Sequence, residues 1–203
     1  MKKITKRIML CLCIAVLVWC GSLIADRNRL HDNLIRLHVV AASDSEEDQA
    51  LKLRVRDAVT ESLTEAMKEV ADTEQAKAYL HENLEKIEAV ANAVLRAAGS
   101  EDRAAVTLEE EAFDTRYYET FTLPAGVYEA LRITIGEGEG HNWWCVVFPT
   151  LCVPATSEGF SDVAAGAGFP DTLTAALEGK DGYEIRFFLL DVLGQMENMF
   201  FQG

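Results

Sequence analysis

The spacing of apolar residues changes once along this chain, near Gly99, and this change limits the folds that the chain can adopt. Before Gly99, two long stretches repeat apolar residues every three or four positions, which is typical of amphipathic helices. After Gly99, shorter segments alternate apolar and polar residues with the period of a strand, and turn residues separate them. Helical runs followed by runs of strand predict an α+β domain.

The two helical stretches carry recognisable start and stop signals. Ser43-Asp44-Ser45 offers N-cap residues ahead of three acidic residues, whose charge suits a helix N-terminus. The second helix is predicted to begin at Asp72 or Thr73 and to end before Gly99, a suitable residue just past a helix end. Their apolar stripes include Leu51, Val55, Val59, Leu63 and Met67 in the first helix and Leu80, Leu84, Ile87, Ala91 and Leu95 in the second.

Strands are predicted on both sides of these helices. Ile35–Ala41 alternates as a half-buried strand would and is expected to be central. Further strands are expected around residues 105–113, 116–123 and 127–135. The unbroken apolar run Trp143–Phe148 predicts a strand buried on both faces. The glycines of Gly136–Gly140 serve the turn before this last strand, and their two intervening glutamates disfavour a phosphate loop.

The C-terminal part of the chain predicts one more helix. Its apolar stripe is expected to pack back on the sheet and consists of Ile185, Phe188, Leu189, Val192, Leu193 and Met196. The predicted fold is therefore an α+β domain with an antiparallel-rich sheet, packed by two long N-terminal helices and a C-terminal helix. Residues from about 149 to 182 show no clear periodicity and are predicted to form a flexible excursion.

The N-terminus has the pattern of a targeting or anchoring segment. Four basic residues in positions 2–7 precede Ile8–Ala25, which contains no charged residue and approaches the length of a membrane span. The basic residues stay in the cytoplasm and the bulk of the chain crosses the membrane. Residues 1–25 are interpreted as either a cleaved signal peptide or an uncleaved anchor. A polar tether, 26–33, and a single exported domain, 34–203, follow.

The charge of the exported part restricts its partners. Without the four basic residues of the N-terminal segment, 15 basic residues stand against 33 acidic ones, a formal charge of −18. A surface of this sign repels phosphate backbones and anionic lipid headgroups. We therefore expect no nucleic-acid partner, and contact with the membrane only through the N-terminal segment. No pattern in the sequence calls for a cofactor.

Partner-binding residues are predicted in and near the segment Gly140–Cys152, which contains two of the three tryptophans. Neighbours in a strand point in opposite directions, so one of the two tryptophans can face outward and serve as a binding hot spot. The alternative is that both fill the core. Acidic residues after the first strand suit a basic receptor face, although helix capping also explains them. The candidates are Asp44, Glu46, His141, Asn142, Trp143 and Trp144.

Cys145 and Cys152 are the two cysteines outside the N-terminal run. Outside the cytoplasm they could form a disulfide across Pro149, or Cys145 could remain a buried thiol. A metal site would need more ligands than His141 and these two residues, so none is predicted. Cys145 with His141, or with His38 near an acidic residue, could also form the dyad of a thiol hydrolase. The spacing of Cys145 and His141 across a loop and the lack of an oxyanion-hole motif argue against catalysis.

Three separated motifs give the chain a resemblance to a known family. Leu34–Val59, Leu123–Gly140 and His141–Cys152 occur in this order behind an export segment and resemble the stage II sporulation protein R family. The resemblance extends from Ile35 to Phe148. It implies a signal, not an enzyme, exported from the forespore of an endospore-forming bacterium into the space between forespore and mother cell.

The resemblance also implies a partner, a membrane-embedded sporulation aspartic protease of the mother cell. This protease removes the pro-sequence of the early mother-cell sigma factor. A cell-envelope thiol hydrolase and a structural envelope protein are the alternatives to this function.

Overall fold

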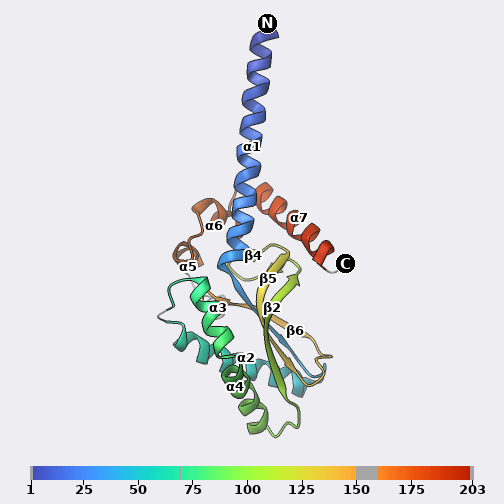
Figure 1. Ribbon diagram of the computed structural model, residues 1–203. Coiled ribbons are helices and arrows are strands. Elements are labelled where there is room, and N and C mark those ends of the chain that lie inside the picture. The colour runs from blue at the N-terminus through green and yellow to red at the C-terminus, as the bar shows by residue number, and fades with distance from the viewer. Residues whose placement is uncertain (1, 69, 150–159, 202–203) are drawn as a thin grey trace.

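The computed structural model describes residues 2–68, 70–149 and 160–201. One long helix, α1 (Lys2–Asn33), projects from a folded domain, and its N-terminal part stands clear of the rest of the chain (Figure 1). Apolar side chains from Ile8 to Val18 are exposed along this part. Among the described residues, α1 is the one helix long and apolar enough to cross a membrane. The N-terminal segment is thus compatible with a signal or an anchor.

The polar tether predicted over residues 26–33 is instead the last part of α1. Asp26 is buried, and its carboxylate accepts a hydrogen bond from the Arg186 Nε at 2.8 Å. Leu30, one turn further on, is buried in the domain. These contacts hold residues 26–33 as a helix against the domain, so no irregular segment separates the projecting helix from the fold.

A four-stranded mixed sheet forms the centre of the domain, in the order β2-β5-β1-β6. The strands are β1 (Ile35–Val40), β2 (Ala104–Phe113), β5 (Gly126–Ile135) and β6 (Asn142–Phe148). β1 runs parallel to β5, whereas the β1–β6 and β2–β5 pairs are antiparallel. This arrangement confirms the α+β fold, the predominance of antiparallel pairs and the central position of the first strand.

One face of the sheet is covered by α2 (Glu46–Ala66), α3 (Thr73–Glu82) and α4 (Leu84–Ala97). Their apolar stripes meet the side chains of alternate strand positions in one buried cluster, the helix-side core. Its members include Leu37, Val39, Val55, Val59, Leu80, Leu95, Leu131 and Ile133. The stripes predicted from the helical spacing are therefore the ones that the protein buries.

The second predicted helix is wrong in being a single element, because it breaks at Asn83 between α3 and α4. The side-chain amide of Asn83 donates a hydrogen bond to the Tyr79 carbonyl at 2.9 Å, which competes with the helical ladder. The predicted start is confirmed, since Asp72 accepts a hydrogen bond from the Gln75 amide at the N-cap. The apolar stripe continues across the break, which is why the spacing alone predicts one helix.

The opposite face of the sheet is covered by the last turns of α1 and by the C-terminal elements (Figure 1). These elements are α5 (Phe160–Gly166), α6 (Asp171–Leu177) and α7 (Glu184–Phe201). Their buried side chains form a second cluster with the sheet, the C-terminal core. It includes Leu23, Leu30, Phe113, Tyr128, Val146, Phe160, Leu173 and Leu190.

Two predicted segments differ from the structure on this side. The excursion predicted over residues 149–182 contains α5 and α6 in its described part, from Phe160 onward, and both helices bury apolar side chains. Residues 150–159 lie outside the described residues. The strand predicted over 116–123 is a small hairpin of β3 (Arg116–Tyr117) and β4 (Thr122–Leu123).

The final helix is confirmed, but the side that it turns to the sheet is not the predicted one. Gly194 approaches the Ala125 carbonyl so closely that an added Cβ would lie 1.6 Å from its oxygen. This close approach, possible only for glycine, selects the face of α7 that contains Leu190, Gly194 and Asn198. Much of the apolar stripe expected to pack on the sheet is exposed instead.

Candidate functional site

The loop after β1 and the hairpin between β5 and β6 meet at one end of the sheet, and most of the predicted partner-binding residues lie there. The His141 backbone amide donates a hydrogen bond to Asp44 Oδ1 at 2.6 Å, and the His141 ring Nδ1 lies 2.5 Å from the same oxygen. Both side chains are exposed. The hydrogen bond from the His141 side chain is the main reason that the pKa of Asp44 lies below its usual value.

Gly140 allows these two loops to come together. A Cβ at this position would lie 2.3 Å from the Ser43 carbonyl oxygen, and the Gly140 amide donates to the Ala41 carbonyl at 3.0 Å. Gly136 and Gly138 of the same turn have positive φ angles of 57° and 69°. The glycine-rich segment therefore serves a tight turn and a close backbone approach, as the sequence predicts.

Lys52 connects the hairpin to α2. Its ammonium donates to the His141 carbonyl at 2.8 Å and to Gln49 Oε1 at 2.6 Å, and the residue is 4 % exposed. Burial lowers the pKa of Lys52, because a desolvated ammonium loses part of its hydration. The backbone of His141 is thus held from two sides, by Asp44 and by Lys52, while its ring remains exposed.

Trp143 and Trp144 lie on opposite faces of β6, as expected of neighbours in a strand. Trp143 is 38 % exposed, and the Arg56 guanidinium of α2 lies 4.2 Å from the centre of its ring. Trp144 is half-buried on the other face, where its ring stacks on His38 at 5.5 Å between centroids. Arg116 lies over the same ring at 3.5 Å. Neither tryptophan fills the core completely, and Trp143 is the one available to a partner.

Glu46 and Asn142 are also exposed. Glu46 opens α2 behind the N-cap Ser45, whose hydroxyl accepts from the Asp48 amide at 3.1 Å. We call the exposed group Asp44, Glu46, His141, Asn142 and Trp143 the tip surface, because it lies at the end of β1 opposite to α1. Trp144 does not belong to it.

Cys145 is buried and disulfide-bonded. The predicted partner, Cys152, lies outside the described residues, so the pairing of these two cysteines stays a prediction. A disulfide leaves no thiolate on Cys145, and the His141 ring is engaged by Asp44. The geometry therefore gives no support to a Cys145–His141 dyad. Across residues 2–68, 70–149 and 160–201, no three His, Cys, Asp or Glu side chains gather as metal ligands would.

A row of polar side chains, of which Arg36 and His38 are buried and Glu111 and Arg132 partly buried, lies on the face of the sheet opposite to α2 and was not predicted from the sequence. β1 is buried on both faces, not half-buried as predicted, and Arg36 and His38 point into the C-terminal core. Both Glu111 carboxylate oxygens lie within 2.9 Å of His38 Nδ1, and Arg132 Nη1 lies 3.1 Å from Oε1. The charges of His38, Glu111 and Arg132 match across β1, β2 and β5, but they indicate a contact only once the order of these strands is known.

Arg36 has an unusual environment for a fully buried cation. Its guanidinium lies 4.2 Å from the centre of the Phe113 ring and 5.2 Å from that of Tyr128. Its Nη2 donates to the Tyr118 hydroxyl at 3.0 Å. Aromatic faces, not a carboxylate, thus surround the charge. Burial raises the pKa of Tyr128, which keeps this neighbour neutral.

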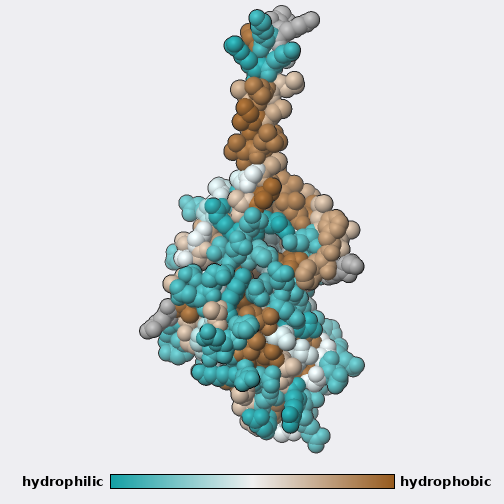
Figure 2. All heavy atoms as spheres, in the orientation of Figure 1, coloured by the Kyte–Doolittle hydropathy of each residue, from teal (hydrophilic) through white to brown (hydrophobic). Residues whose placement is uncertain are grey.

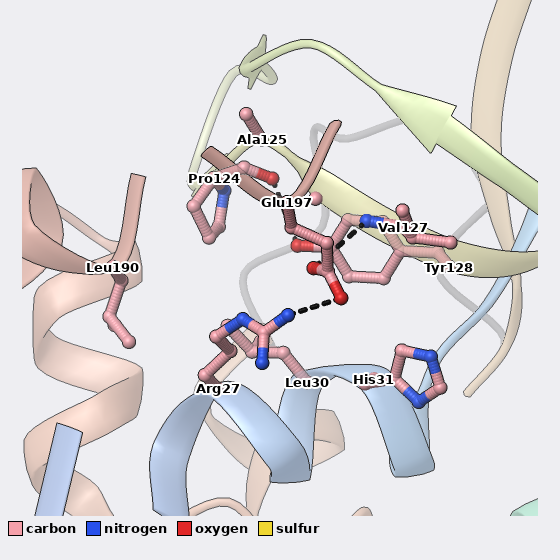
Figure 3. A pocket seen from close by; sticks show the side chains of 10 residues that line it. Arg27, Leu30, His31, Pro124, Ala125, Val127, Tyr128, Leu190 and Glu197 are labelled. Carbon is pink, nitrogen blue, oxygen red and sulfur yellow. Dashed lines mark hydrogen bonds and ion pairs between the residues drawn. The ribbon is translucent and has the colours of Figure 1, made fainter. Parts of the chain in front are cut away.

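A small pocket lies where α1, α7 and the start of β5 meet (Figure 3). An ion pair between Arg27 of α1 and Glu197 of α7 crosses it, and the Tyr128 hydroxyl donates to the Pro124 carbonyl at 2.9 Å beside it. Its volume of about 10 Å³ accommodates no more than one water molecule. The pocket is a packed junction between α1 and the domain and has no room for a small-molecule ligand.

These features define a class: an α+β domain carried on an N-terminal apolar helix, with an exposed aromatic and acidic tip. The family model described as stage II sporulation protein R matches residues 31–158. The chain is also 34% identical over 184 residues to stage II sporulation protein R of Bacillus subtilis (strain 168), covering 81% of this chain and 82% of the relative.

The chain belongs to the stage II sporulation protein R family. This is not an enzyme family by name. No solved structure matches the chain.

Proposed function

We propose that this protein is an exported signal of endospore formation, which passes from the forespore to the mother cell. It triggers a membrane-embedded aspartic protease that processes the precursor of the early mother-cell sigma factor. One observation supports the proposal. The chain combines the domain of a sporulation protein family with a preceding apolar helix of membrane-spanning length. The helix supplies the means of export or anchoring that such a signal needs.

The tip surface is the proposed contact with the protease. An exposed tryptophan flanked by acidic and imidazole side chains has the composition of a binding hot spot. Its distance along the strands from α1 keeps it away from the membrane that α1 enters (Figure 1). The acidic residues at its edge suit a basic receptor face.

The signal acts by differential binding. A ligand shifts a receptor between two states only by the difference in its affinity for them. The tip surface therefore binds the active conformation or oligomeric state of the protease more tightly than the inactive one.

Co-expression in a non-sporulating host tests the proposal. The full chain, the protease and the sigma-factor precursor are produced together, and cleavage of the precursor is followed by immunoblot. We expect cleavage only when this protein is present and exported. An unprocessed precursor, with all three proteins present and the signal exported, would contradict direct activation.

Two variants locate the contact in the same assay. Trp143→Ala is expected to reduce cleavage strongly, since loss of a hot spot worth about 2 kcal/mol weakens binding about 30-fold. Tyr117→Ala is the matched control, because Tyr117 is an aromatic residue of β3 that is 81 % exposed and lies outside the tip surface. Equal cleavage by the two variants, at equal protein levels, would remove the tip surface from the proposal.

The alternatives make different predictions. A thiol hydrolase loses all function in a Cys145→Ala variant that still folds, whereas a binding signal retains it. A structural envelope protein self-assembles persistently and acts without the protease, which sedimentation of the purified chain would reveal. The disulfide at Cys145 favours the binding signal over the hydrolase.

A further inference from the structure

α7 exposes apolar side chains, and several of its polar side chains face the domain. Its exposed side is an apolar stripe at helical spacing, in which Ile185, Phe188 and Met196 are 67 %, 61 % and 50 % exposed. Half-buried Val192 completes the stripe between them, and Met199, on the same side, is also exposed. We call Ile185, Phe188, Val192 and Met196 the α7 stripe. An exposed row of this kind marks an interaction site in a soluble protein.

Several polar residues of α7 face the domain instead, whereas Glu184 and Gln195 are exposed. The Asp191 carboxylate accepts hydrogen bonds from the Ala125 amide at 2.8 Å and from the Thr115 hydroxyl at 2.5 Å. The Asn198 side-chain amide donates to the Phe113 carbonyl at 2.8 Å. Surface helices of soluble domains show the reverse order, with polar side chains toward water and apolar ones toward the core. An apolar environment therefore suits the outer side of α7 better than water does.

The position of α7 identifies that environment. Arg186 bonds Asp26 of α1, and Arg27 of α1 pairs with Glu197, so α7 is fastened across the point where α1 enters the domain. Leu23 of α1 and Leu190 of α7 belong to the same buried cluster. Figure 2 shows the hydrophobic side chains of α7 next to those of the projecting part of α1. With α1 in a bilayer, α7 lies at the level of its surface.

We infer that α7 is a second membrane contact, which lies in the boundary between headgroups and acyl chains with the α7 stripe toward the lipid. Helices that lie in this boundary bury one apolar face a short way into it. Because α1 already holds the domain at the membrane, the contact is intramolecular and needs little affinity of its own. The inference rests on retention of α1 as a span.

The lipid contact is hydrophobic, not electrostatic. Arg186 is the one basic residue of α7, and its guanidinium is occupied by Asp26, while Glu184 and Glu197 are acidic. Anionic headgroups therefore gain no attraction from this helix, unlike the basic amphipathic helices of many peripheral proteins. Zwitterionic lipid is the matching surface, in keeping with the acidic character of the whole domain.

Spin labels on the uncleaved full chain in phosphatidylcholine vesicles test the inference. Cys11, Cys13 and Cys20, the free cysteines, are replaced by alanine, and a single label is placed by Phe188→Cys or, as the water-exposed control, by Tyr117→Cys. Collision rates with oxygen, which concentrates in lipid, and with a water-soluble nickel chelate are compared. We expect the oxygen-to-nickel ratio to be several-fold higher at position 188 than at 117.

A Met199→Cys label gives a second expectation. It should report a shallower position than the label at 188, because α7 slopes from beside α1 away from the projecting part of that helix (Figure 1). Addition of phosphatidylglycerol should not deepen either label. Equal ratios at 188 and 117 would overturn the inference. Dipolar broadening of the spectrum of the 188 label, if it persists when the protein is diluted with more lipid, would show that two copies of the chain meet at α7. That result would overturn the inference.

The outcome is independent of signalling, since neither protease nor precursor is present. A lipid-exposed label together with a negative co-expression assay would reject the proposed function alone. An aqueous label together with positive co-expression would reject the membrane contact alone.

Discussion

The two faces of the central sheet are built by different means. On the face covered by α2, α3 and α4, buried side chains are almost all aliphatic, and their spacing in the helices matches the alternation in the strands. On the face covered by α1 and α5–α7, aromatic rings surround a buried arginine, and histidine, glutamate and arginine side chains cross the strands. The first face depends on fit between apolar surfaces, the second on specific polar and aromatic contacts.

The difference shows how an alternating strand should be interpreted. In β1, polar residues alternate with apolar ones, which usually indicates a face in water. Here Arg36 and His38 are covered by segments more than 70 residues away in sequence, which supply their hydrogen-bond partners. Polar alternation therefore marks a change in the kind of packing in this domain, not the edge of the core.

The largest effect is expected from Leu131→Ala on the helix-side core. Leu131 is fully buried in the middle of β5, so truncation leaves a cavity in a rigid apolar layer. We expect a loss of about 3 to 4 kcal/mol in the free energy of unfolding. Urea unfolding of the full chain in mild detergent, followed by tryptophan fluorescence, measures it. A loss below about 1 kcal/mol would show that this face repacks easily.

Gly194→Ala tests the opposite face. The added methyl group would meet the Ala125 carbonyl and push α7 from the sheet, at a cost of about 2 to 3 kcal/mol. Gly166→Ala is the control, because a Cβ there has nothing within 4 Å. The same unfolding assay should leave the control within about 0.5 kcal/mol of the parent. Matching stabilities of the two variants would mean that α7 is not held by this contact.

Arg36→Met tests whether the charge of Arg36 stabilises the second face of the sheet, and its expected effect on the free energy of unfolding is smaller. Among the described residues, Nε and Nη1 of Arg36 have no hydrogen-bond partner, so the desolvation of the cation is only partly offset. A methionine of similar length retains the aromatic contacts, and we expect a change of less than about 1 kcal/mol in the same unfolding assay. A loss above about 2 kcal/mol would show that the charge itself stabilises the C-terminal core.

The smallest effect is expected at the tip surface, from Asp44→Asn. His141 holds the pKa of Asp44 below its ordinary value of 3.8, so the Asp44 carboxylate binds a proton more weakly in the folded chain than in the unfolded chain. The stabilising contribution is complete above pH 3.8 and disappears as the pH falls through the folded pKa. Unfolding temperatures measured across this range should decline slightly less steeply with acid in Asp44→Asn than in the parent. If the unfolding temperatures of the two proteins fall in parallel with acid, the Asp44–His141 hydrogen bond does not contribute to the stability of the fold.

Local patterns were sufficient for one half of the fold. The helix starts predicted at Ser43–Ser45 and at Asp72 or Thr73, and the apolar stripes that follow, depend on neighbours along the chain; the structure confirms them, with N-caps at Ser45 and Asp72. The predicted central position of the first strand is also confirmed. The break at Asn83, the helices within 160–177 and the orientation of α7 depend on contacts between distant segments. The approach of Gly194 to Ala125 has no counterpart in hydrophobic spacing, and it reverses the side of α7 that is buried.

In the candidate site, too, local patterns did not predict the contacts between distant segments. The sequence brings attention to Asp44, His141 and the two tryptophans, and strand alternation correctly separates Trp143 from Trp144. It gives no reason to place Asp44 beside His141, because their contact requires β1 and β6 to pair and Gly140 to admit the Ser43 carbonyl. The polar row on the second face required the β2–β5–β1 register, which spacing alone does not provide.

The continuity of α1 into the domain has a consequence for how a partner is met. With α1 retained, the helix removes the orientational freedom that a tether would give, so the tip is presented at a nearly constant height above the bilayer. The search for a partner is then a lateral one, in two dimensions, and its success depends on the width of the gap that the domain must bridge. Under the proposed signalling role, contact with the protease would therefore depend on the width of the gap between the two membranes as well as on the residues of the tip surface.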